Sequence, residues 1–189
     1  MAARSTSSTV QRLVLVAIAP LPVAIASTFA LLLMVGERFP RQLAPGEGLW
    51  SWGLLLSAVI ATVLWAAMRT GQREPRLAGL LTALLVVTSL LAWPTWTWGV
   101  LPSINGVRVS NVQTTTMRLQ RLEQTTVSKS RERNHWAHLT PTVPGPPLAK
   151  GRYFIARDTY DLWQPGAPRD VVVDHGTGLL GARVVLALR

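Results

Sequence analysis

The stretch "LAGLLTALLVVTSLLAWPTWTWGVL", residues 77–101, contains no charged side chain. The hydrocarbon core of a bilayer is about 30 Å thick, and a helix needs about 20 apolar residues to cross it. Two more uncharged runs precede it, at residues 13–36 and 49–68. The three runs therefore predict a membrane α-helical domain over residues 13–101, with three transmembrane helices.

The composition separates the chain into an apolar part and a polar part. Hydrophobic residues make up 49% of the 189 residues and charged residues 15%, whereas about 25% are charged in a typical soluble domain. The net charge is +10, which in a membrane protein favours contacts with the lipid bilayer over contacts with nucleic acid. The absence of cysteine excludes disulfides, thiolate metal sites and cysteine nucleophiles.

The first run has two features of its own. The sequence "AIA" at residues 24–26, after Arg4 and Arg12, is similar to a signal-peptidase site. The apolar run continues through "STFALLLMVG" beyond that point, so we expect an uncleaved span. Pro20 and Pro22 lack an N–H to donate, and they predict a kink in the middle of this helix.

Basic residues flanking the runs predict the orientation of the chain. The segment 1–12 and the loop after the second run carry Arg4, Arg12, Arg69, Arg73 and Arg76, whereas the loop after the first run carries Arg38 and Arg41. Cytoplasmic loops hold an excess of Lys and Arg, and long domains translocate largely regardless of charge. We therefore expect a bacterial inner-membrane protein with segment 1–12 in the cytoplasm and residues 37–48 and 102–189 in the periplasm.

Tryptophans gather where the second run begins and the third run ends, at Trp50, Trp52, Trp93, Trp96 and Trp98. Indole rings prefer the headgroup level of a bilayer, so these residues predict a membrane-interface belt. The alternative is an aromatic cage for a quinone or a sterol.

Small residues recur along two of the runs, at Gly53, Ser57, Ala61, Gly79 and Ala83. Such residues let helices approach closely, so we expect a helix-packing stripe, either within the chain or against a partner's helix. The runs contain no Asp, Glu, Lys, Arg or His, which argues against a pump, a transporter of charged substrates or a voltage sensor.

Residues 102–189 alternate between apolar and polar side chains in several short segments. They predict an extramembrane, mostly β domain with about five strands, one of them a short strand around Val107 and Val109. A short helix capped by Asp158 should place Tyr160 and Trp163 on one face. The pattern is typical of a small curved sheet or barrel of the oligonucleotide-binding or SH3-like kind.

The segment "DHGTG" at residues 174–178 resembles the phosphate-binding hairpin of the sugar kinase, actin and Hsp70 superfamily. That hairpin holds phosphates together with later loops, and only the short run 179–189 follows here. We therefore expect no ATP site but a hairpin turn, with Gly176 and Gly178 at positive φ.

The histidines are the other candidates for chemistry. His135, His138 and His175 are the three histidines of the chain, and with a carboxylate they could form a zinc site. Residues 131–139 alternate as a strand does, with Trp136 and His138 on one side. His135 and His138 should point to opposite faces of that strand, so we expect no metal site. No serine stands in a nucleophile-elbow context. We expect no enzymatic activity and no cofactor.

Basic residues gather in one part of the tail, at Arg118, Arg121, Lys129, Arg131 and Arg133. They are either a solvated face or a contact surface for anionic headgroups or an acidic partner.

The leading hypothesis is a non-enzymatic inner-membrane protein whose periplasmic domain binds another protein or a second copy, as an accessory subunit, scaffold or immunity factor. The alternative is a ligand-gated membrane effector that senses an anionic small molecule, such as a nucleotide signal. The alternative requires the tail to lie in the cytoplasm.

Overall fold

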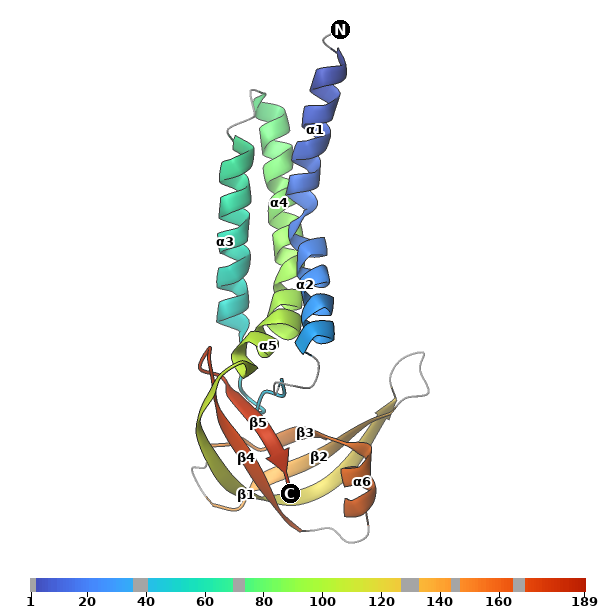
Figure 1. The fold of residues 1–189 in the computed structure, drawn as a ribbon, viewed down its shortest axis with the longest axis vertical. Coiled ribbons are helices and arrows are strands. Elements are labelled where there is room, and N and C mark those ends of the chain that lie inside the picture. Colours follow the sequence, from blue (N-terminus) through green and yellow to red (C-terminus); the bar gives the residue numbers. More distant parts are fainter. Residues whose placement is uncertain (1–2, 36–40, 70–73, 127–132, 144–146, 165–168) are drawn as a thin grey trace. The chain divides into compact units, whose positions relative to one another are not determined.

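The computed structural model describes residues 3–35, 41–69, 74–126, 133–143, 147–164 and 169–189. The chain forms two compact units, a helical unit (Met1–Arg38 with Leu49–Ser103) and a β-unit (Phe39–Gly48 with Ile104–Arg189) (Figure 1). The expected combination of long apolar helices with a small, mostly β domain is confirmed.

The helical unit consists of α1 (Ala3–Ile18), α2 (Pro20–Val35), α3 (Trp50–Arg69), α4 (Pro75–Thr95) and the π-helical turn η1 (Trp96–Val100), which leads into α5 (Leu101–Gly106). Among the described residues, α3 and the continuous helix Pro75–Gly106 are each long and apolar enough to cross a membrane. The pair α1 and α2 qualifies as a third span if the two helices count as one. The third helix thus extends beyond Leu101, where the apolar run ends.

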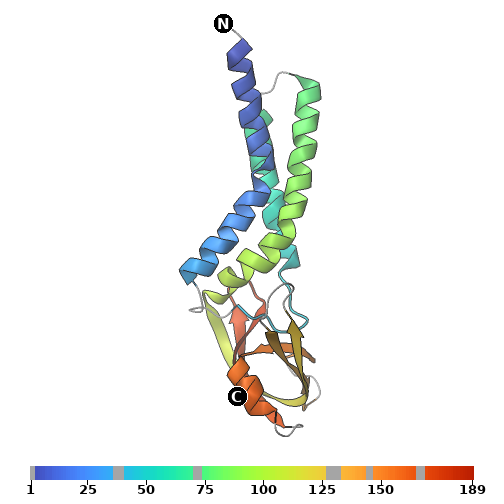
Figure 2. The same cartoon turned by 90° about the vertical axis from the view of Figure 1, so that its right-hand side faces the viewer.

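The expected kink in the first run is confirmed. The two parts of this helix are bent by 52° at a break between Ile18 and Pro20, and Figure 2 shows the bend. Proline suits the first position of a helix because the first N–H groups have no partner within it. The N–H of Ala19 donates to the carbonyl of Val16 at 3.3 Å. This bond spans three residues, whereas the bonds of an α-helix span four. The two prolines therefore end α1 and begin α2.

Apolar side chains cover the outside of the helical unit as well as its interior. Ala17, Met68, Leu81 and Leu85 form a buried core. Among the largest exposed side chains, Leu33 is 85% and Leu80 is 71% exposed. Large apolar surfaces of this kind mark contacts with a membrane or a partner.

The β-unit contains a five-stranded antiparallel sheet that curls into a half-barrel. Its strands are β1 (Val109–Thr126), β2 (Arg133–Pro141), β3 (Gly151–Ile155), β4 (Asp170–Gly178) and β5 (Arg183–Leu188), in the order β3-β2-β1-β4-β5. The long strand β1 lies at the centre, because its first half pairs with β4 and its second half with β2. The separate short strand expected around Val109 is therefore the beginning of β1.

The short helix α6 (Arg157–Trp163) follows β3 and packs against the core of the sheet. Tyr160 and Trp163 are both buried in that core, which confirms the predicted face of the helix. The expectation that Asp158 caps this helix is wrong: the N-cap residue is Ala156, and Asp158 lies within the first turn. There the carboxylate still complements the positive end of the helix dipole.

The segment "DHGTG" lies within β4, so the expectation of positive φ at Gly176 and Gly178 is wrong. The turn comes later, and its left-handed residue is Gly181, with φ 87°. Both earlier glycines are needed for close approach. A Cβ on Gly176 would lie 2.4 Å from Cγ1 of Val109, and one on Gly178 would lie 2.5 Å from the carbonyl oxygen of Asn105.

Residues 41–48, between the first two apolar runs, belong to the β-unit. Leu43 forms an isolated antiparallel bridge with Val184 of β5. The N–H of Ala44 donates to the carbonyl of Arg183 at 3.0 Å. This segment therefore pairs with the edge strand β5.

The same segment also contacts the opposite edge of the sheet. Pro45 packs so closely on Gly151 of β3 that a Cβ there would lie 2.3 Å from the Cβ of Pro45. Arg183 donates to a carboxylate oxygen of Glu47 at 3.1 Å. Residues 41–47, the closing segment, thus contact both β5 and β3, the two edge strands of the half-barrel.

Candidate functional site

One face of β1, β2 and β3 carries a connected group of charged and aromatic side chains, which we call the outer platform: Arg121, Glu123, Trp136, His138, Arg152 and Phe154. Strand register brings them together. Glu123 lies opposite Trp136, which lies opposite Phe154. Alternate side chains of a strand share a face, and the intervening Ala137 and Tyr153 are fully buried on the other face.

The aromatic half of the outer platform is fixed by three contacts. The rings of Trp136 and Phe154 meet edge to face, with centroids 5.5 Å apart. The guanidinium of Arg152 lies 4.5 Å from the centre of the Trp136 ring, and the indole N–H donates to the hydroxyl of Thr125 at 2.9 Å. Phe154 remains 45% exposed, so an ordered aromatic surface is available on this face.

The charged half of the outer platform surrounds Glu123. A carboxylate oxygen of Glu123 is bonded to Nε2 of His138 at 2.5 Å. Arg121 and Arg152 approach the same carboxylate at 3.6 and 3.7 Å. The hydrogen bond from His138, together with the charges of Arg152 and Arg121, lowers the pKa of Glu123.

Positive charge exceeds negative charge on this face. A hollow of about 340 Å³ adjoins His138 and is lined by Gln120, Arg121, Thr140 and Lys150 among other residues. Glu123 cannot neutralise two arginines and a lysine. Arginine beside aromatic rings is also the composition found at the centres of binding interfaces.

The predicted basic cluster is divided in the structure. Arg118 and Arg121 both lie on the outer face, because a bulge between Leu119 and Arg121 shifts the register of β1. Arg133 donates to the side chain of Gln124 at 3.1 Å. Gln124 lies opposite the inward-facing His135, so Arg133 does not join the other two. Lys129 and Arg131 lie outside the described residues.

A second hollow lies at the end of the sheet where β2, β3 and α6 meet. It has a volume of about 720 Å³ and is lined by Gln124, Arg133, Asn134, His135, Phe154, Ile155, Arg157 and Asp161. His135 is buried and its ring lies 4.8 Å from that of Tyr160. Arg157 and Asp161 form an exposed ion pair at 3.7 Å. Nitrogen donors outnumber carboxylates in this hollow.

The three histidines lie in separate places. His135 and His138 occupy opposite faces of β2, as expected. His175 is 2% exposed, and its Nε2 is bonded to the hydroxyl of Thr115 at 2.9 Å. Burial and the nearby Arg183 lower the pKa of His175. Within the described ranges, no three His, Cys, Asp or Glu side chains are grouped as a metal site would need.

The small residues of the predicted packing stripe have different surroundings. Gly53 and Ser57 are buried, and a Cβ on Gly53 would lie 2.0 Å from the hydroxyl of Thr97. This glycine therefore allows α3 to approach η1. Ala61 is half-buried, whereas Gly79 and Ala83 are exposed on α4.

The tryptophans of the predicted belt are partly packed against one another. Trp50 meets Trp93 and Trp98 edge to face, each with centroids 5.1 Å apart. The indole N–H of Trp93 donates to the backbone carbonyl of Trp50 at 3.2 Å. Trp52 is exposed, whereas Trp96 is buried inside the helical unit.

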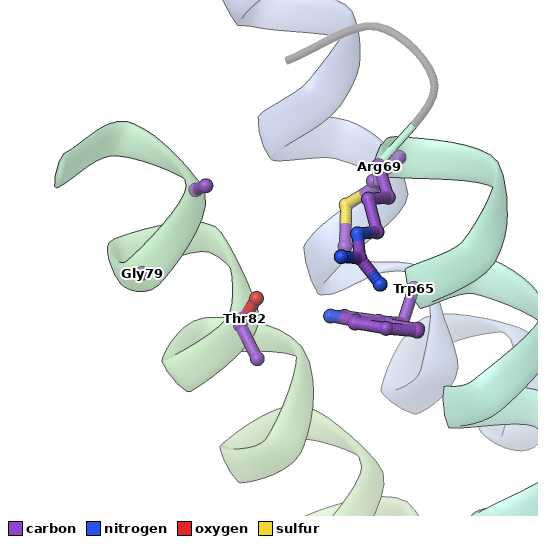
Figure 3. A pocket seen from close by; sticks show the side chains of 6 residues that line it. Trp65, Arg69, Gly79 and Thr82 are labelled. Carbon is purple, nitrogen blue, oxygen red and sulfur yellow. The ribbon is translucent and has the colours of Figure 1, made fainter. Parts of the chain in front are cut away.

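A cleft lies between α3 and α4 in the helical unit. It has a volume of about 260 Å³ and is lined by Trp65, Met68, Arg69, Ala78, Gly79 and Thr82. Figure 3 shows the Arg69 guanidinium above the Trp65 ring, with Thr82 extending toward them from α4. The guanidinium carbon lies 5.0 Å from the ring centre.

Sequence reasoning identified only part of these sites. Alternation along residues 131–139 correctly placed Trp136 and His138 on one side of a strand. It did not identify Glu123, Arg152 or Phe154 as their neighbours, because those contacts depend on the register of three strands.

Comparison with models of protein families, with curated proteins and with solved structures finds no match.

Proposed function

We propose that this protein is a non-enzymatic membrane protein whose β-unit binds an acidic segment of another protein at the outer platform. The observation that carries the proposal is the arrangement of Trp136, Phe154 and Arg152. Two rings in edge-to-face contact remain partly exposed beside a guanidinium. Because these side chains are already held in place, they would lose little additional conformational entropy when a partner binds.

Charge complementarity selects the kind of partner. Arg121 and Arg152 flank the carboxylate of Glu123, and Lys150 lines the adjoining hollow together with Arg121 and His138. Carboxylates of a partner would find guanidinium donors and a cationic field here, while its apolar side chains would cover Phe154. A protein that binds such a partner would be an accessory subunit, a scaffold or an immunity factor. The test below distinguishes this kind of partner from a second copy of this chain.

The apolar outer surface of the helical unit supports residence in a membrane. The exposed Leu33, Val63 and Leu80 would face lipid, and the bent pair α1 and α2 would form the first of three spans. If the chain crosses the membrane three times, the closing segment and residues 102–189 would lie on the same side of the membrane. The pairing of Leu43 with Val184 supports that arrangement.

The orientation in our proposal follows the distribution of basic residues. The N-terminal segment and the loop with Arg69 and Arg76 would face the cytoplasm of a bacterium. The β-unit would then lie in the periplasm. Single cysteines at Gly71 and Asp158 of this cysteine-free chain test this with an impermeant thiol reagent on spheroplasts. Labelling of Asp158→Cys alone is expected, and labelling of Gly71→Cys alone would reverse the orientation.

Binding is tested by replacing Phe154 with a photo-crosslinking amino acid in intact cells. We expect a covalent adduct with one protein, identified by mass spectrometry, and loss of that adduct when Arg152→Glu and Arg121→Glu are added. The matched control places the cross-linker at Leu162, which is exposed on α6. Adducts with lipid only, or the same proteins captured from Leu162, would contradict the proposal.

A second candidate, a ligand-gated effector, is supported by the hollow of about 720 Å³ near His135. Arg133 and Arg157 line it, and both suit a phosphate-bearing small molecule. This candidate predicts cytoplasmic labelling in the cysteine experiment. It also predicts nucleotide binding to the purified protein that Arg133→Gln and Arg157→Gln weaken, while cross-linking from Phe154 yields no protein.

A further inference from the structure

The cleft between α3 and α4 combines a cationic group with open space beside an apolar helix. Arg69 occupies the last turn of α3, where a cation is also favoured by the helix dipole. Gly79 and Thr82 lie across the cleft on α4. A Cβ built on Gly79 meets no atom within 4 Å, so no described part of the chain fills the space beside it.

The polar groups around the cleft can all donate hydrogen bonds. In Figure 3 the guanidinium of Arg69 and the nitrogen-bearing edge of Trp65 lie toward the gap, and the Thr82 side chain extends into it from the other wall. Arginine and the indole N–H are donors only, and a threonine hydroxyl can donate. The described residues that line the cleft include no Asp or Glu. The matching ligand is a group with several anionic oxygens.

The surroundings of the cleft indicate which kind of molecule carries this anionic group. Leu80 and Ala83 are exposed on the same helix, so a hydrocarbon chain could lie along α4 next to the polar group. The Trp65 ring fixes Arg69 by a cation–π contact at 5.0 Å, at the end of a long apolar helix. A phosphate with attached acyl chains satisfies the donors and covers the apolar wall at once.

We propose that this cleft is a binding site for an anionic phospholipid. Arg69 pairs with the phosphate, the indole N–H of Trp65 and the hydroxyl of Thr82 bind its oxygens, and an acyl chain passes over Gly79. The inference rests on the membrane location in our proposed function. It does not depend on the partner that the β-unit binds.

Native mass spectrometry of the full chain in detergent tests the proposal with phosphatidylglycerol, phosphatidylcholine and inorganic phosphate as separate probes. We expect one phosphatidylglycerol per chain to be retained. Phosphatidylcholine, whose choline compensates the charge, and inorganic phosphate should bind at least about tenfold more weakly, which is the change expected for one charge-assisted contact.

Two variants test the cleft in different ways. Arg69→Gln removes the charge, and Gly79→Leu fills the space while it keeps every donor; each should weaken phosphatidylglycerol binding about tenfold. Arg12→Gln and Ala58→Leu, an exposed position on α3 that does not line the cleft, are the matched controls and should bind as the wild type does. The proposal is overturned by unchanged binding in Gly79→Leu, by equal binding of phosphatidylcholine, or by tight binding of inorganic phosphate.

Two further measurements separate this inference from the proposed function. The thermal unfolding midpoint of Gly79→Leu should be no lower than that of the wild type, because the side chain enters open space and replaces a glycine within a helix. Extraction of membranes with alkaline carbonate tests membrane residence on its own. Release of the protein would refute the membrane location, whereas retention without a preference for phosphatidylglycerol would refute the lipid site alone.

Discussion

The hydroxyl of Thr88 in α4 lies 2.7 Å from the backbone carbonyl oxygen of Ala17, near the end of α1, and donates a hydrogen bond to it. Both residues are buried. The last carbonyls of a helix have no partner within it, and in the membrane that we propose for this unit no water would be available to replace one. Thr88 therefore satisfies a group that the break before Pro20 leaves free.

Replacing Thr88 with valine removes this hydroxyl and keeps the shape of the side chain. We expect the free energy of unfolding of the helical unit to fall by about 0.6–2 kcal/mol, the range for hydrogen bonds between membrane helices. Unfolding of the purified protein in mixed detergent micelles measures the change. Thr62→Val is the matched control, because the Thr62 hydroxyl is exposed and bonds within its own helix to Ala58. Equal losses in both variants would contradict the role of Thr88.

The pairing of Leu43 with Val184 predicts a disulfide in a doubly substituted chain. Hydrogen bonds flank this pair on both sides, from Ala44 to Arg183 and from Val185 to Gln42. The pair itself is therefore a non-hydrogen-bonded one, in which the Cα atoms are about 4.5 Å apart, within the range of disulfides.

Leu43→Cys with Val184→Cys should oxidise readily, and the bridge should appear as a linked peptide pair in mass spectrometry. Because the chain has no other cysteine, the product is unambiguous. Gly46→Cys with Val184→Cys is the control, and it should remain reduced under the same conditions. Failure of the first pair to oxidise would show that the closing segment does not pair with β5.

The helices were predictable because a single physical requirement, an apolar length that spans a bilayer, fixes the pattern. The same holds for the break at Pro20, since the missing N–H acts locally. The closing segment was not predictable, because Leu43 and Ala44 form too short an apolar pattern. Their partners in β5 lie far along the chain, and no local signal indicates the pairing.

The outer platform was predictable only along individual strands. Alternation gave the side on which Trp136 and His138 lie, but it could not give the residues opposite them. The bulge before Arg121 also changes the pattern, since it brings Arg118 and Arg121 to one face although their spacing in a regular strand would separate them. The predicted basic cluster assumed closeness in sequence, and the sheet separates Arg133 from the others.

The contact of Gly178 with Asn105 predicts a strong effect of one added methyl group. Asn105 is fully buried and donates from its amide to the carbonyl of Ala182 at 3.1 Å. Its amide oxygen also accepts from the N–H of Leu180 at 2.9 Å. A Cβ on Gly178 would lie 2.3 Å from that amide nitrogen. Gly178→Ala therefore has to displace the residue that holds the turn between β4 and β5.

We expect Gly178→Ala to lower the free energy of unfolding of the β-unit by roughly 1–3 kcal/mol, as overpacking in a core does. Urea denaturation, monitored by hydrogen exchange of the β4 amides, measures this change in the free energy of unfolding. Gly181→Asn is the control: this position has positive φ and open space around it, and asparagine tolerates the left-handed conformation. A smaller loss for Gly178→Ala than for Gly181→Asn would refute the close-approach argument.

The buried His175 predicts that the β-unit becomes less stable below neutral pH. Burial and Arg183 hold the pKa of His175 below its ordinary value of 6.5. As the pH falls below about 6.5, the unfolded chain therefore binds a proton at this histidine while the folded chain does not. The free energy of unfolding is highest above that pH, and it falls as the pH decreases toward the folded-state pKa.

The loss is measured as the difference between the urea midpoints of the β-unit at pH 7.5 and at pH 5.5. Hydrogen exchange of the β4 amides gives each midpoint, after correction for the pH dependence of the intrinsic exchange rate. His175→Gln keeps a polar group near the Nε2 position, where the bond to Thr115 forms, and cannot take up the proton. It should therefore reduce the difference between the two pH values. His135→Gln retains His175 and should retain the difference. A loss of stability at pH 5.5 that is equally large in wild type and His175→Gln would assign the effect to another group.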